Sequence, residues 1–264
     1  MNLEAASESR PAPLIRLQNV RKTYNTAGRE VVAVSDVTMD IAEGDLVSIV
    51  GPSGCGKTTV LKILAGLHDA NGGTVTFGTD TDAAFTAGSD VGMVFQQPLL
   101  LKWRTVLDNV LLPAQILGLP AKAAKERARD LLQMVGLGNA GDHFPYQLSG
   151  GMQQRAAIAR ALVHDPKLVL MDEPFGALDA ITREKMNLEM LRIWQHSRKT
   201  FILVTHGIQE AIFLGSRCAV LTSGPARMAD YFDINLPHPR HLDIKTSDAF
   251  GAYVKRVYRQ LGME

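Results

Sequence analysis

The chain has 264 residues, of which 46% are hydrophobic and 21% are charged, and its formal net charge at pH 7 is +1. This composition is typical of a folded globular protein and excludes an intrinsically disordered chain, in which hydrophobic content is low and net charge is high. A near-neutral charge also gives no general electrostatic reason to bind nucleic acid, so we expect no nucleic-acid partner.

Cysteine usage and hydropathy predict the compartment. The two cysteines, Cys55 and Cys218, lie far apart, so neither a disulfide framework nor a CxxC zinc or redox site is indicated. No apolar run approaches the ~18 to 20 residues that cross a bilayer, and residues 1–13 are polar, unlike a signal peptide. We therefore expect a soluble cytoplasmic protein, with residues 1–13 forming a flexible tail.

The first part of the chain predicts strands on the N-terminal side of a glycine-rich segment. Short β-rich runs indicate a small antiparallel sheet, and they lie at 14–17, 31–34 and 37–41. Residues 45–50 are apolar and predict a buried strand. Residues 59–67, beyond the glycine-rich segment, have apolar side chains at helical spacing.

The middle of the chain is mostly helical in pattern, from about 105 to 163. It contains an alanine-rich, charged run at 121–134 and a second helical run at 152–162. These patterns predict two or more helices between the glycine-rich segment and the strands that follow.

The last part of the chain returns to strands. Apolar runs at 168–171 and 201–204 predict two buried strands, each surrounded by helical sequence. Strands that alternate with helices indicate an α/β core with a parallel sheet. After Gly224 the prolines predict irregular structure, followed by a short closing helix at 249–260.

Residues 51–58 read GPSGCGKT and match the phosphate-loop pattern GxxxxGK[ST], between a predicted strand and a predicted helix. Glycines let the backbone curl around phosphates and direct N–H groups at them, and the helix adds the positive end of its dipole. We predict that Lys57 contacts the β- and γ-phosphates of ATP and that the Thr58 hydroxyl binds Mg²⁺. The predicted nucleotide-binding residues here are Gly51, Pro52, Ser53, Gly54, Cys55, Gly56, Lys57, Thr58 and Thr59.

Cys55 lies within this loop and allows two interpretations. A helix N-terminus lowers the pKa of a thiol, so Cys55 could act as a redox switch. Alternatively, it is a small residue that the loop tolerates, and we favour this second interpretation.

Asp172 and Glu173 follow an apolar run and place two carboxylates at the carboxyl end of a buried parallel strand, where α/β proteins bind ligands. Side chains alternate along a strand, so we expect the two acids to have different tasks. We predict that Asp172 holds Mg²⁺ and that Glu173 is the general base that polarises water for attack on the γ-phosphate. His206 follows the strand predicted at 201–204 and fits a γ-phosphate contact.

Residues 148–155, LSGGMQQR, resemble the signature motif of the ATP-binding cassette (ABC) proteins. A serine and two glycines at a helix start form an anion site by the same physics as the phosphate loop. One nucleotide needs only one such loop, so a second site indicates a second nucleotide. In the family, the signature residues, here Ser149, Gly150 and Gly151, grip ATP across the interface of a head-to-tail dimer.

The resemblance covers residues 14–223 and implies a fold and a domain organisation. The expected fold class is α/β, with a phosphate-loop NTPase core around a parallel sheet, an N-terminal antiparallel β subdomain and a helical signature subdomain at about 98–163. The expected ATPase domain spans 14–235, and residues 236–264 are expected to form a C-terminal extension with a short helix.

Further site residues follow from the resemblance. Tyr24 resembles the aromatic residue that stacks on adenine, and Gln96 resembles the glutamine that touches Mg²⁺ and senses the membrane partner. Residues 177–179, ending in Asp179, resemble the loop that crosses the dimer interface, and His206 resembles the switch histidine. The complete set of predicted catalytic residues is Glu173, His206, Gln96 and Lys57, and the predicted metal ligands are Thr58, Gln96 and Asp172.

The chain also resembles one class within the family. Met152 and the sequence LLKWRTV at 100–106 are similar to those of the nitrate, sulfonate and taurine importers of bacteria. Lys102 stands where these importers usually have proline, and Gly207 replaces an aspartate often found after the switch histidine.

The apolar run at 99–101, together with Trp103, has two interpretations. It could pack in the core, or it could form a groove beside Gln96 that receives a helix of a membrane permease. The sequence does not separate the two.

The expected function is that of the ATP-hydrolysing subunit of an ABC importer, in which closure and reopening of a dimer around MgATP reset a permease. The implied partners are a second copy of the chain, integral-membrane permease subunits and an extracytoplasmic solute-binding protein. The implied location is the cytoplasmic face of the inner membrane. The solute is not encoded in this chain, because selectivity belongs to the permease and the binding protein.

The sequence argues against two other functions. A non-transport cassette ATPase acting on DNA or ribosomes would predict long coiled coils, a duplicated cassette or a basic face, and the sequence has none of these. A phosphate-loop kinase for a small molecule would leave residues 148–155 unexplained.

Overall fold

The computed structural model describes residues 13–26, 28–78, 85–222 and 224–263. The strands in this part of the chain are β1 (Ile15–Thr26), β2 (Arg29–Ile41), β3 (Leu46–Val50), β4 (Gly72–Phe77), β5 (Val91–Val94), β6 (Leu168–Asp172), β7 (Thr200–Thr205), β8 (Arg217–Leu221) and β9 (Ala226–Asp233). The helices are α1 (Lys57–Leu64), α2 (Ala87–Asp90), α3 (Val106–Ile116), α4 (Ala121–Met134), α5 (Gly150–Leu162), α6 (Ala180–Ser197), α7 (Ile208–Leu214) and α8 (Asp248–Gln260), with 3₁₀ turns at Pro145–Gln147 and Leu242–Thr246.

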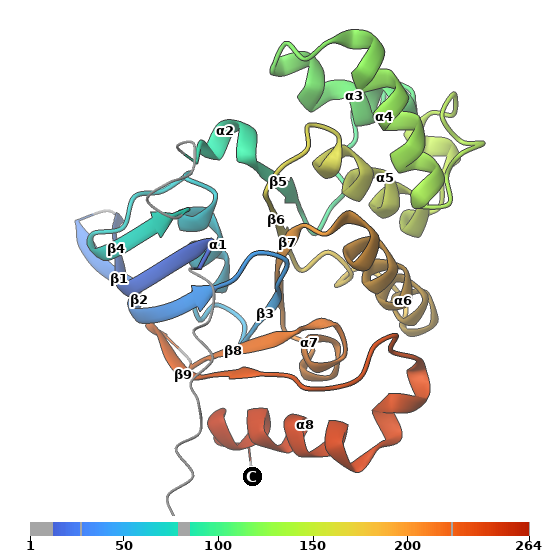
Figure 1. The fold of residues 1–264 in the computed structure, drawn as a ribbon. Helices are drawn as coiled ribbons and strands as arrows, with labels where there is room; N and C mark the ends of the chain where they lie inside the picture. Colours follow the sequence, from blue (N-terminus) through green and yellow to red (C-terminus); the bar gives the residue numbers. More distant parts are fainter. Residues whose placement is uncertain (1–12, 27, 79–84, 223, 264) are drawn as a thin grey trace, which may run out of the picture.

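The described strands form one mixed sheet in the order β4-β1-β2-β9-β8-β3-β7-β6-β5. Strands β8, β3, β7, β6 and β5 pair with one another in parallel, whereas β4, β1 and β2 pair with one another antiparallel. Figure 1 shows the antiparallel part on one side and the parallel part in the centre of the molecule. The predicted α/β core and the N-terminal antiparallel sheet are therefore both confirmed.

The register of the parallel strands brings their carboxyl ends to one edge. Val50 of β3 pairs with Thr205 of β7, and Asp172 of β6 pairs with Val204 of the same strand. The chain leaves the sheet at this edge after each of the parallel strands, and the exits after β3, β5, β6 and β7 carry residues that the sequence marked as functional.

Two hydrophobic cores cover the two faces of the parallel strands, because side chains alternate along each strand. On β3, Leu46 and Val50 belong to one core, and Val47 and Ile49 belong to the other. The first core also contains the apolar sides of α3 to α8, and the second contains α1 and the antiparallel strands. This double coverage explains why β3, β6 and β7 read as continuous apolar runs.

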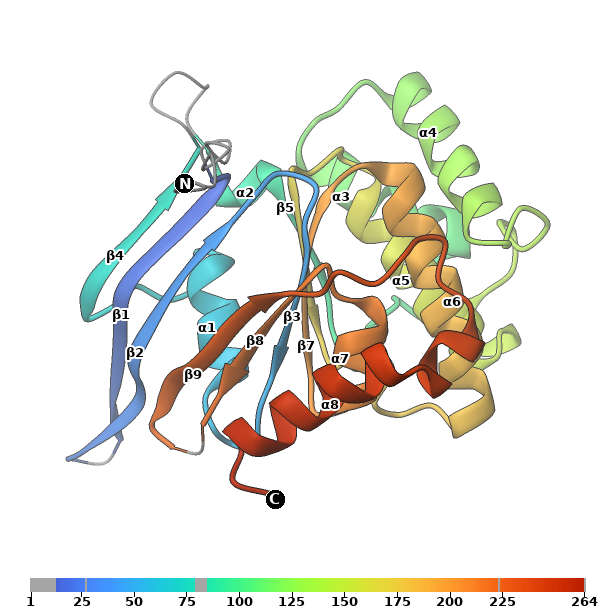
Figure 2. The same ribbon diagram turned by 60° about the horizontal axis from the view of Figure 1, so that its bottom comes forward.

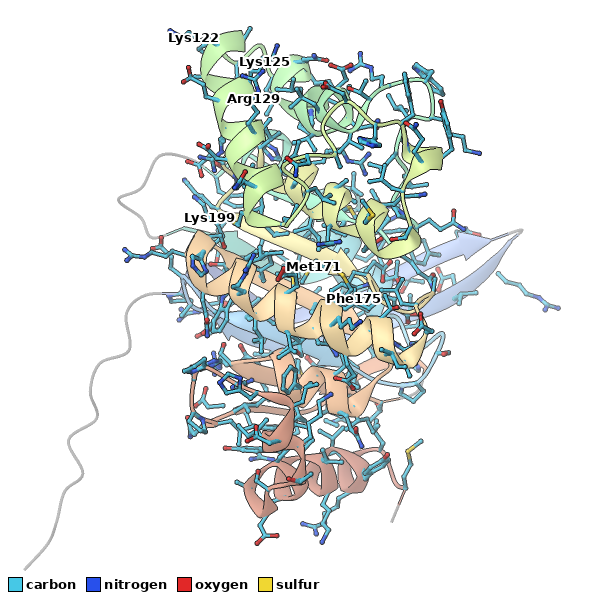
Figure 3. The ribbon with its side chains drawn as sticks, turned by 90° about the vertical axis from the view of Figure 1, so that its right-hand side faces the viewer. Lys122, Lys125, Arg129, Met171, Phe175 and Lys199 are labelled. Atoms are coloured by element: carbon cyan, nitrogen blue, oxygen red, sulfur yellow. The ribbon has the colours of Figure 1, made fainter. Side chains whose placement is uncertain are left out.

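The helical middle of the chain folds as predicted. Helix α4 has the bounds that its alanine-rich run predicts, and it packs with α3 and α5. Figure 3 shows its basic residues Lys122, Lys125 and Arg129 on the outer side, whereas Met171 and Phe175 lie inside. Both of these apolar side chains are fully buried in the first core.

The segment after Gly224 differs from the expectation of irregular structure. Residues Ala226–Asp233 form β9, which pairs antiparallel with β8 and in parallel with β2, so it joins the two parts of the sheet. The prediction was wrong because the polar residues of β9 hide its pattern, and most of its side chains are only half-buried. Cross-strand neighbours, rather than intrinsic propensity, determine the strand here.

Helix α8 closes the chain at Asp248–Gln260, close to the predicted 249–260, and lies beside α7 and β9 in Figure 2. Phe250 and Val257 are buried in the first core. The domain boundaries at 14–235, 98–163 and 236–264 stay predictions, and the expected tail lies outside the described residues apart from Pro13. Within the described ranges, no helix combines the length and apolar character of a membrane span.

Candidate functional site

The phosphate loop connects β3 to α1 and depends on glycine at several positions. Gly54 and Gly56 have φ angles of +74° and +112°, in the region that disfavours other residues. A Cβ at Gly51 would lie 2.5 Å from the carbonyl oxygen of Leu221, and a Cβ at Gly56 would lie 2.5 Å from that of Ala33. The loop can therefore pack against the neighbouring strands only with glycine at both positions.

Positive charge concentrates at this loop. The Lys57 side chain is almost fully buried, and its Nζ donates hydrogen bonds to the carbonyl oxygens of Gly51 at 2.8 Å and Pro52 at 2.9 Å. Helix α1 begins at the same residue and has no acidic side chain in its first turn. An anion at the helix start would therefore meet an ammonium group and unneutralised backbone N–H groups.

Asp172 and Thr58 form an oxygen-rich pair beside the loop. The Thr58 hydroxyl donates to Asp172 Oδ1 at 3.2 Å. Burial raises the pKa of the Asp172 carboxyl, and the Thr58 hydrogen bond partly offsets this rise. Hydroxyl and carboxylate oxygens are the ligands that Mg²⁺ accepts, with waters and substrate phosphates filling its other positions. The described residues hold no cluster of three or more His, Cys, Asp or Glu side chains that could bind a metal alone.

Glu173 and His206 meet where β6 and β7 end. Glu173 Oε2 lies 3.2 Å from His206 Nδ1, with half of the histidine side chain exposed to solvent. The Glu173 backbone has a φ of +46°, which is rare for a residue with a side chain, and its N–H donates to the carbonyl oxygen of Val204 at 2.9 Å. The fold thus holds a strained acid next to a histidine at the edge of the sheet.

Gln96 follows β5 and reaches the same place. A Cβ added to Gly176 would lie 3.2 Å from Gln96 Nε2 and 3.6 Å from Glu173 Oε2. The Gln96 amide and the Glu173 carboxylate therefore converge on one point, and Gly176 leaves the space between them open. Gln96, Glu173 and His206, which the sequence separates widely, are brought together here.

Ser149 begins α5 on another part of the molecule. Its hydroxyl oxygen accepts a hydrogen bond from the Met152 N–H at 3.4 Å, and the first turn of α5 has no acidic residue. Ser149 and Gly150 are exposed, whereas Gly151 is buried near Thr182. Figures 1 and 2 both show α5 well away from α1, so this helix start and the phosphate loop do not face the same nucleotide within one chain.

Two more predicted residues have local partners. Asp179 caps the start of α6 by accepting a hydrogen bond from the Thr182 N–H at 3.0 Å, which lowers the pKa of its carboxyl. Tyr24 lies on β1, with the ring of His68 packed edge-on at 5.6 Å and Lys22 Nζ 5.4 Å from its ring centre. The structure therefore gives Asp179 a capping role and leaves Tyr24 on the half-buried surface of β1.

Cys55 is part of the phosphate loop, and its side chain is buried. Burial raises the pKa of its thiol, so the helix start does not activate it as a nucleophile. This environment supports the interpretation of Cys55 as a small residue that fits the loop.

Sequence reasoning missed two residues that anchor the segment after Gln96. Gln154 of α5 is buried and donates to the Phe95 carbonyl oxygen at 3.2 Å. Arg160 of the same helix donates to the carbonyl oxygens of Leu99 at 2.8 Å and Pro98 at 2.7 Å. Gln154 lies within the signature motif, but no signal in the sequence pairs either residue with a backbone about 60 positions away.

An open groove of about 390 Å³ lies beside this segment. Leu99, which lines the groove, is 55% exposed, and Trp103, four positions further along the chain and not part of the groove lining, is 75% exposed. Core packing is therefore the wrong interpretation for both residues, although Leu100 does pack partly against the first core. The groove lining includes Met93, Phe95, Leu99, Leu112, Pro113, Ile116, Leu117, Arg160 and His164.

Together, the phosphate loop, the acid pair and the parallel sheet define a phosphate-loop NTPase. Comparison with known proteins specifies the family. The ABC transporter family model matches residues 34–176. An uncharacterised ABC transporter ATP-binding protein of Methanocaldococcus jannaschii is 42% identical over 96% of this chain and 93% of its own length. The aliphatic sulfonates import ATP-binding protein of Bacillus cereus is 37% identical over 93% of this chain and 95% of its own.

A solved structure agrees with these relatives. A dimeric ATP-binding cassette in a post-hydrolysis state, bound to ADP and phosphate, aligns with a TM-score of 0.70 and 34% identity over 84% of this chain and all of its own. The chain belongs to the ABC transporter family as an ATP-binding subunit. Its activity is the hydrolysis of ATP.

Proposed function

We propose that the chain drives an importer of small oxyanions, such as sulfonates, taurine or nitrate, as one half of a head-to-tail dimer that closes around two MgATP molecules. The observation that supports this most is the convergence of Thr58, Asp172, Glu173, His206 and Gln96 at the carboxyl edge of the parallel sheet. The importer class is supported by the similarity to the sulfonate-import relative.

The phosphate loop binds the nucleotide in this proposal. Its backbone N–H groups and Lys57 neutralise the phosphates, and Tyr24 stacks on the adenine. Thr58, Asp172 and Gln96 would hold Mg²⁺, which offsets the charge of the β- and γ-phosphates.

Glu173 and His206 act on the attacking water and the γ-phosphate. Glu173 accepts a proton from the water as general base, and it lies at the open edge where water can enter. His206 directs Nδ1 at Glu173, which leaves Nε2 available for a phosphate oxygen. Gln96 contacts the same space from β5 and orients the water or the metal ligands.

A second copy completes the site. The exposed start of α5 offers a further anion site, and Ser149, Gly150 and Gly151 contact the γ-phosphate bound to the partner's loop. Asp179 lies at the start of α6 and crosses the same interface. The dimeric state of the related cassette supports this arrangement.

The membrane partner binds at the groove in this proposal. Exposed Leu99, Trp103 and Ile116 offer apolar contacts to a permease helix, and Arg160 ties the groove wall to α5. The chain would then sit on the cytoplasmic face of the inner membrane. An extracytoplasmic binding protein would deliver the solute. The division into an ATPase domain at 14–235, a helical subdomain at 98–163 and an extension at 236–264 belongs to the same proposal.

The dimer is tested by size-exclusion chromatography with light scattering on Glu173→Gln, which should bind ATP without hydrolysing it. We expect a shift from monomer to dimer on addition of ATP and magnesium. Adding Ser149→Arg should abolish the shift, because a bulky cation would block the anion site. Gln260→Arg, at the exposed end of α8, adds the same charge elsewhere and should leave the shift intact. A dimer that survives Ser149→Arg would contradict the proposed interface.

The groove is tested separately by copurification with the permease subunits. Leu99→Asp should abolish copurification while ATP binding is retained, because it places a charge on the apolar edge. Leu67→Asp is the matched control, since Leu67 is 59% exposed, follows α1 by three residues and lies outside the groove. Equal effects of the two variants would exclude the groove as the docking site.

A further inference from the structure

The segment from Ile234 to Ser247, which we name the C-terminal strap, connects β9 to α8. Figure 2 shows the chain crossing α7 and reaching α6 before it turns into α8. A connecting segment usually lies on the surface with its polar groups in water. This one differs, because Arg240 at its centre is only 3% exposed.

Arg240 donates hydrogen bonds to a cluster of backbone carbonyl oxygens. Its Nη1 contacts the carbonyl oxygens of Ile212 at 3.3 Å, Phe213 at 2.8 Å and Gly215 at 2.9 Å. Its Nη2 contacts that of Ile234 at 3.4 Å. The first three carbonyls stand at the C-terminal end of α7, where a helix leaves carbonyls without partners and where its dipole favours a cation. Arg240 therefore caps α7.

The cap stays charged at neutral pH. Burial lowers the pKa of the Arg240 guanidinium to about 10, which is still well above the physiological range. A planar guanidinium can serve several carbonyls at once, whereas a lysine would offer a single ammonium at one point.

Lys245 makes a second connection from the strap. Its Nζ lies 2.5 Å from Glu184 Oε2 on α6 and 4.6 Å from the ring centre of Phe213 on α7. The strap thus holds both α6 and α7 from the same side. These two helices begin next to Asp179 and His206, respectively.

Helix α7 is held at both ends: at its start the Thr205 hydroxyl accepts a hydrogen bond from the Gly207 N–H at 3.0 Å and donates to the Glu210 carboxylate, and at its end Arg240 binds the free carbonyl oxygens. Its N-cap is Gly207, which provides no side-chain hydrogen bond, and the helix has only 7 residues. A helix this short is not stable on its own and needs tertiary contacts. His206 directly precedes Gly207, the N-cap residue of α7, so a shift of α7 along its axis would move the histidine away from Glu173.

We propose that Arg240 is a positioning residue for ATP hydrolysis, which caps α7 and thereby fixes His206 against Glu173. This inference rests on the proposed role of His206 and extends it to the C-terminal extension. The strap is then a part of the hydrolytic machinery that does not touch the nucleotide. Nucleotide binding, which depends on the phosphate loop and Tyr24, does not require it.

The test is steady-state ATP hydrolysis by the full-length protein, with ATP affinity measured separately by equilibrium binding. Arg240→Ala should lower kcat on the order of ten-fold or more, because small displacements of a reacting group cost this much or more. KM and the ATP dissociation constant should change less than about two-fold, since the lost interaction acts on the transition state. Arg240→Lys should recover part of the loss.

The matched control is Arg256→Ala. Arg256 is also an arginine of the C-terminal extension, but it pairs with Asp230 and stacks on the Phe232 ring, both on β9. This variant should retain wild-type kcat. Equal losses in Arg240→Ala and Arg256→Ala would mean that the extension acts only through general stability, and would overturn the proposal.

A double-mutant cycle separates positioning of His206 from other effects, with rates taken under single-turnover conditions so that slow hydrolysis is measurable. In a His206→Ala background, Arg240→Ala should cause less than about a two-fold further loss. Additive losses would refute action through His206, as would unchanged kcat in Arg240→Ala alone. Full activity of His206→Ala would instead refute the proposed role of the histidine.

Lys245→Met is the alternative variant for the same kinetic test if Arg240→Ala does not fold. It removes the ion pair with Glu184 and keeps an apolar side chain beside Phe213. The same pattern of lower kcat with unchanged KM supports the strap, and wild-type kcat overturns it.

Discussion

Replacing Glu173 with glycine should stabilise the protein while it removes the proposed general base. The Glu173 backbone is held at a φ of +46°, and a side chain in the left-handed region costs roughly 1–2 kcal/mol. Glycine removes this cost but raises the conformational entropy of the unfolded chain, which opposes folding by about 0.4–1 kcal/mol. The midpoints of these two ranges give a net gain of about 0.8 kcal/mol over Glu173→Gln, which lacks the charge but keeps the side chain.

The assay is thermal unfolding without nucleotide, followed by circular dichroism. For a domain of this size the gain corresponds to a rise of roughly 1–4 °C in Tm. The control compares Glu189→Gly with Glu189→Gln within α6, where glycine should cost about 1 kcal/mol. If Glu173→Gly is no more stable than Glu173→Gln, the positive φ stores no strain, and the reasoning that connects this backbone to function is wrong.

Two further predictions concern stability. Gly92→Ala should destabilise the protein by about 1–3 kcal/mol in denaturant unfolding, because its Cβ would lie 2.1 Å from the Ala161 carbonyl oxygen, whereas Gly88→Ala, with open space around it, should not. Burial raises the pKa of the Glu210 carboxyl, so the folded protein is favoured while this carboxyl is protonated. The stability that the protonated carboxyl contributes is fully present below the ordinary glutamate pKa and is lost as pH rises through the pKa of the folded state. Glu210→Gln, which can still accept the Thr205 hydrogen bond, should therefore be more stable than wild type at pH 8, and a stability difference that stays constant from pH 8 to pH 4 would contradict this assignment.

The sequence predicted the location of those residues of the candidate site that local chemistry determines. The glycines of residues 51–56 are required by backbone angles and close packing within the loop itself, so their spacing is visible in one dimension. Asp172, Glu173 and His206 stand directly after apolar runs, and the parallel register then brings them to one edge. The sequence pattern is sufficient here because the strand that directly precedes each residue sets its position.

The remaining features depend on partners that are distant in the chain. Arg240 follows a proline and reads as part of a loop, but its carbonyl partners on α7 lie more than 20 positions earlier. Strand β9 reads as polar, and only its pairing with β8 and β2 makes it a strand. Such contacts leave no periodic signal, so sequence reasoning could not find them.

Helix α5 connects the groove to the exposed serine at its own N-terminal end. Its 13 residues form a rod roughly 20 Å long at 1.5 Å per residue, with Ser149 at one end and Arg160 near the other. Gln154 and Arg160 fasten this rod to the backbone between Phe95 and Leu99, which borders the groove. A permease bound at the groove would therefore contact the same backbone that is hydrogen-bonded to α5, the helix whose N-cap is the serine proposed to reach the partner's nucleotide.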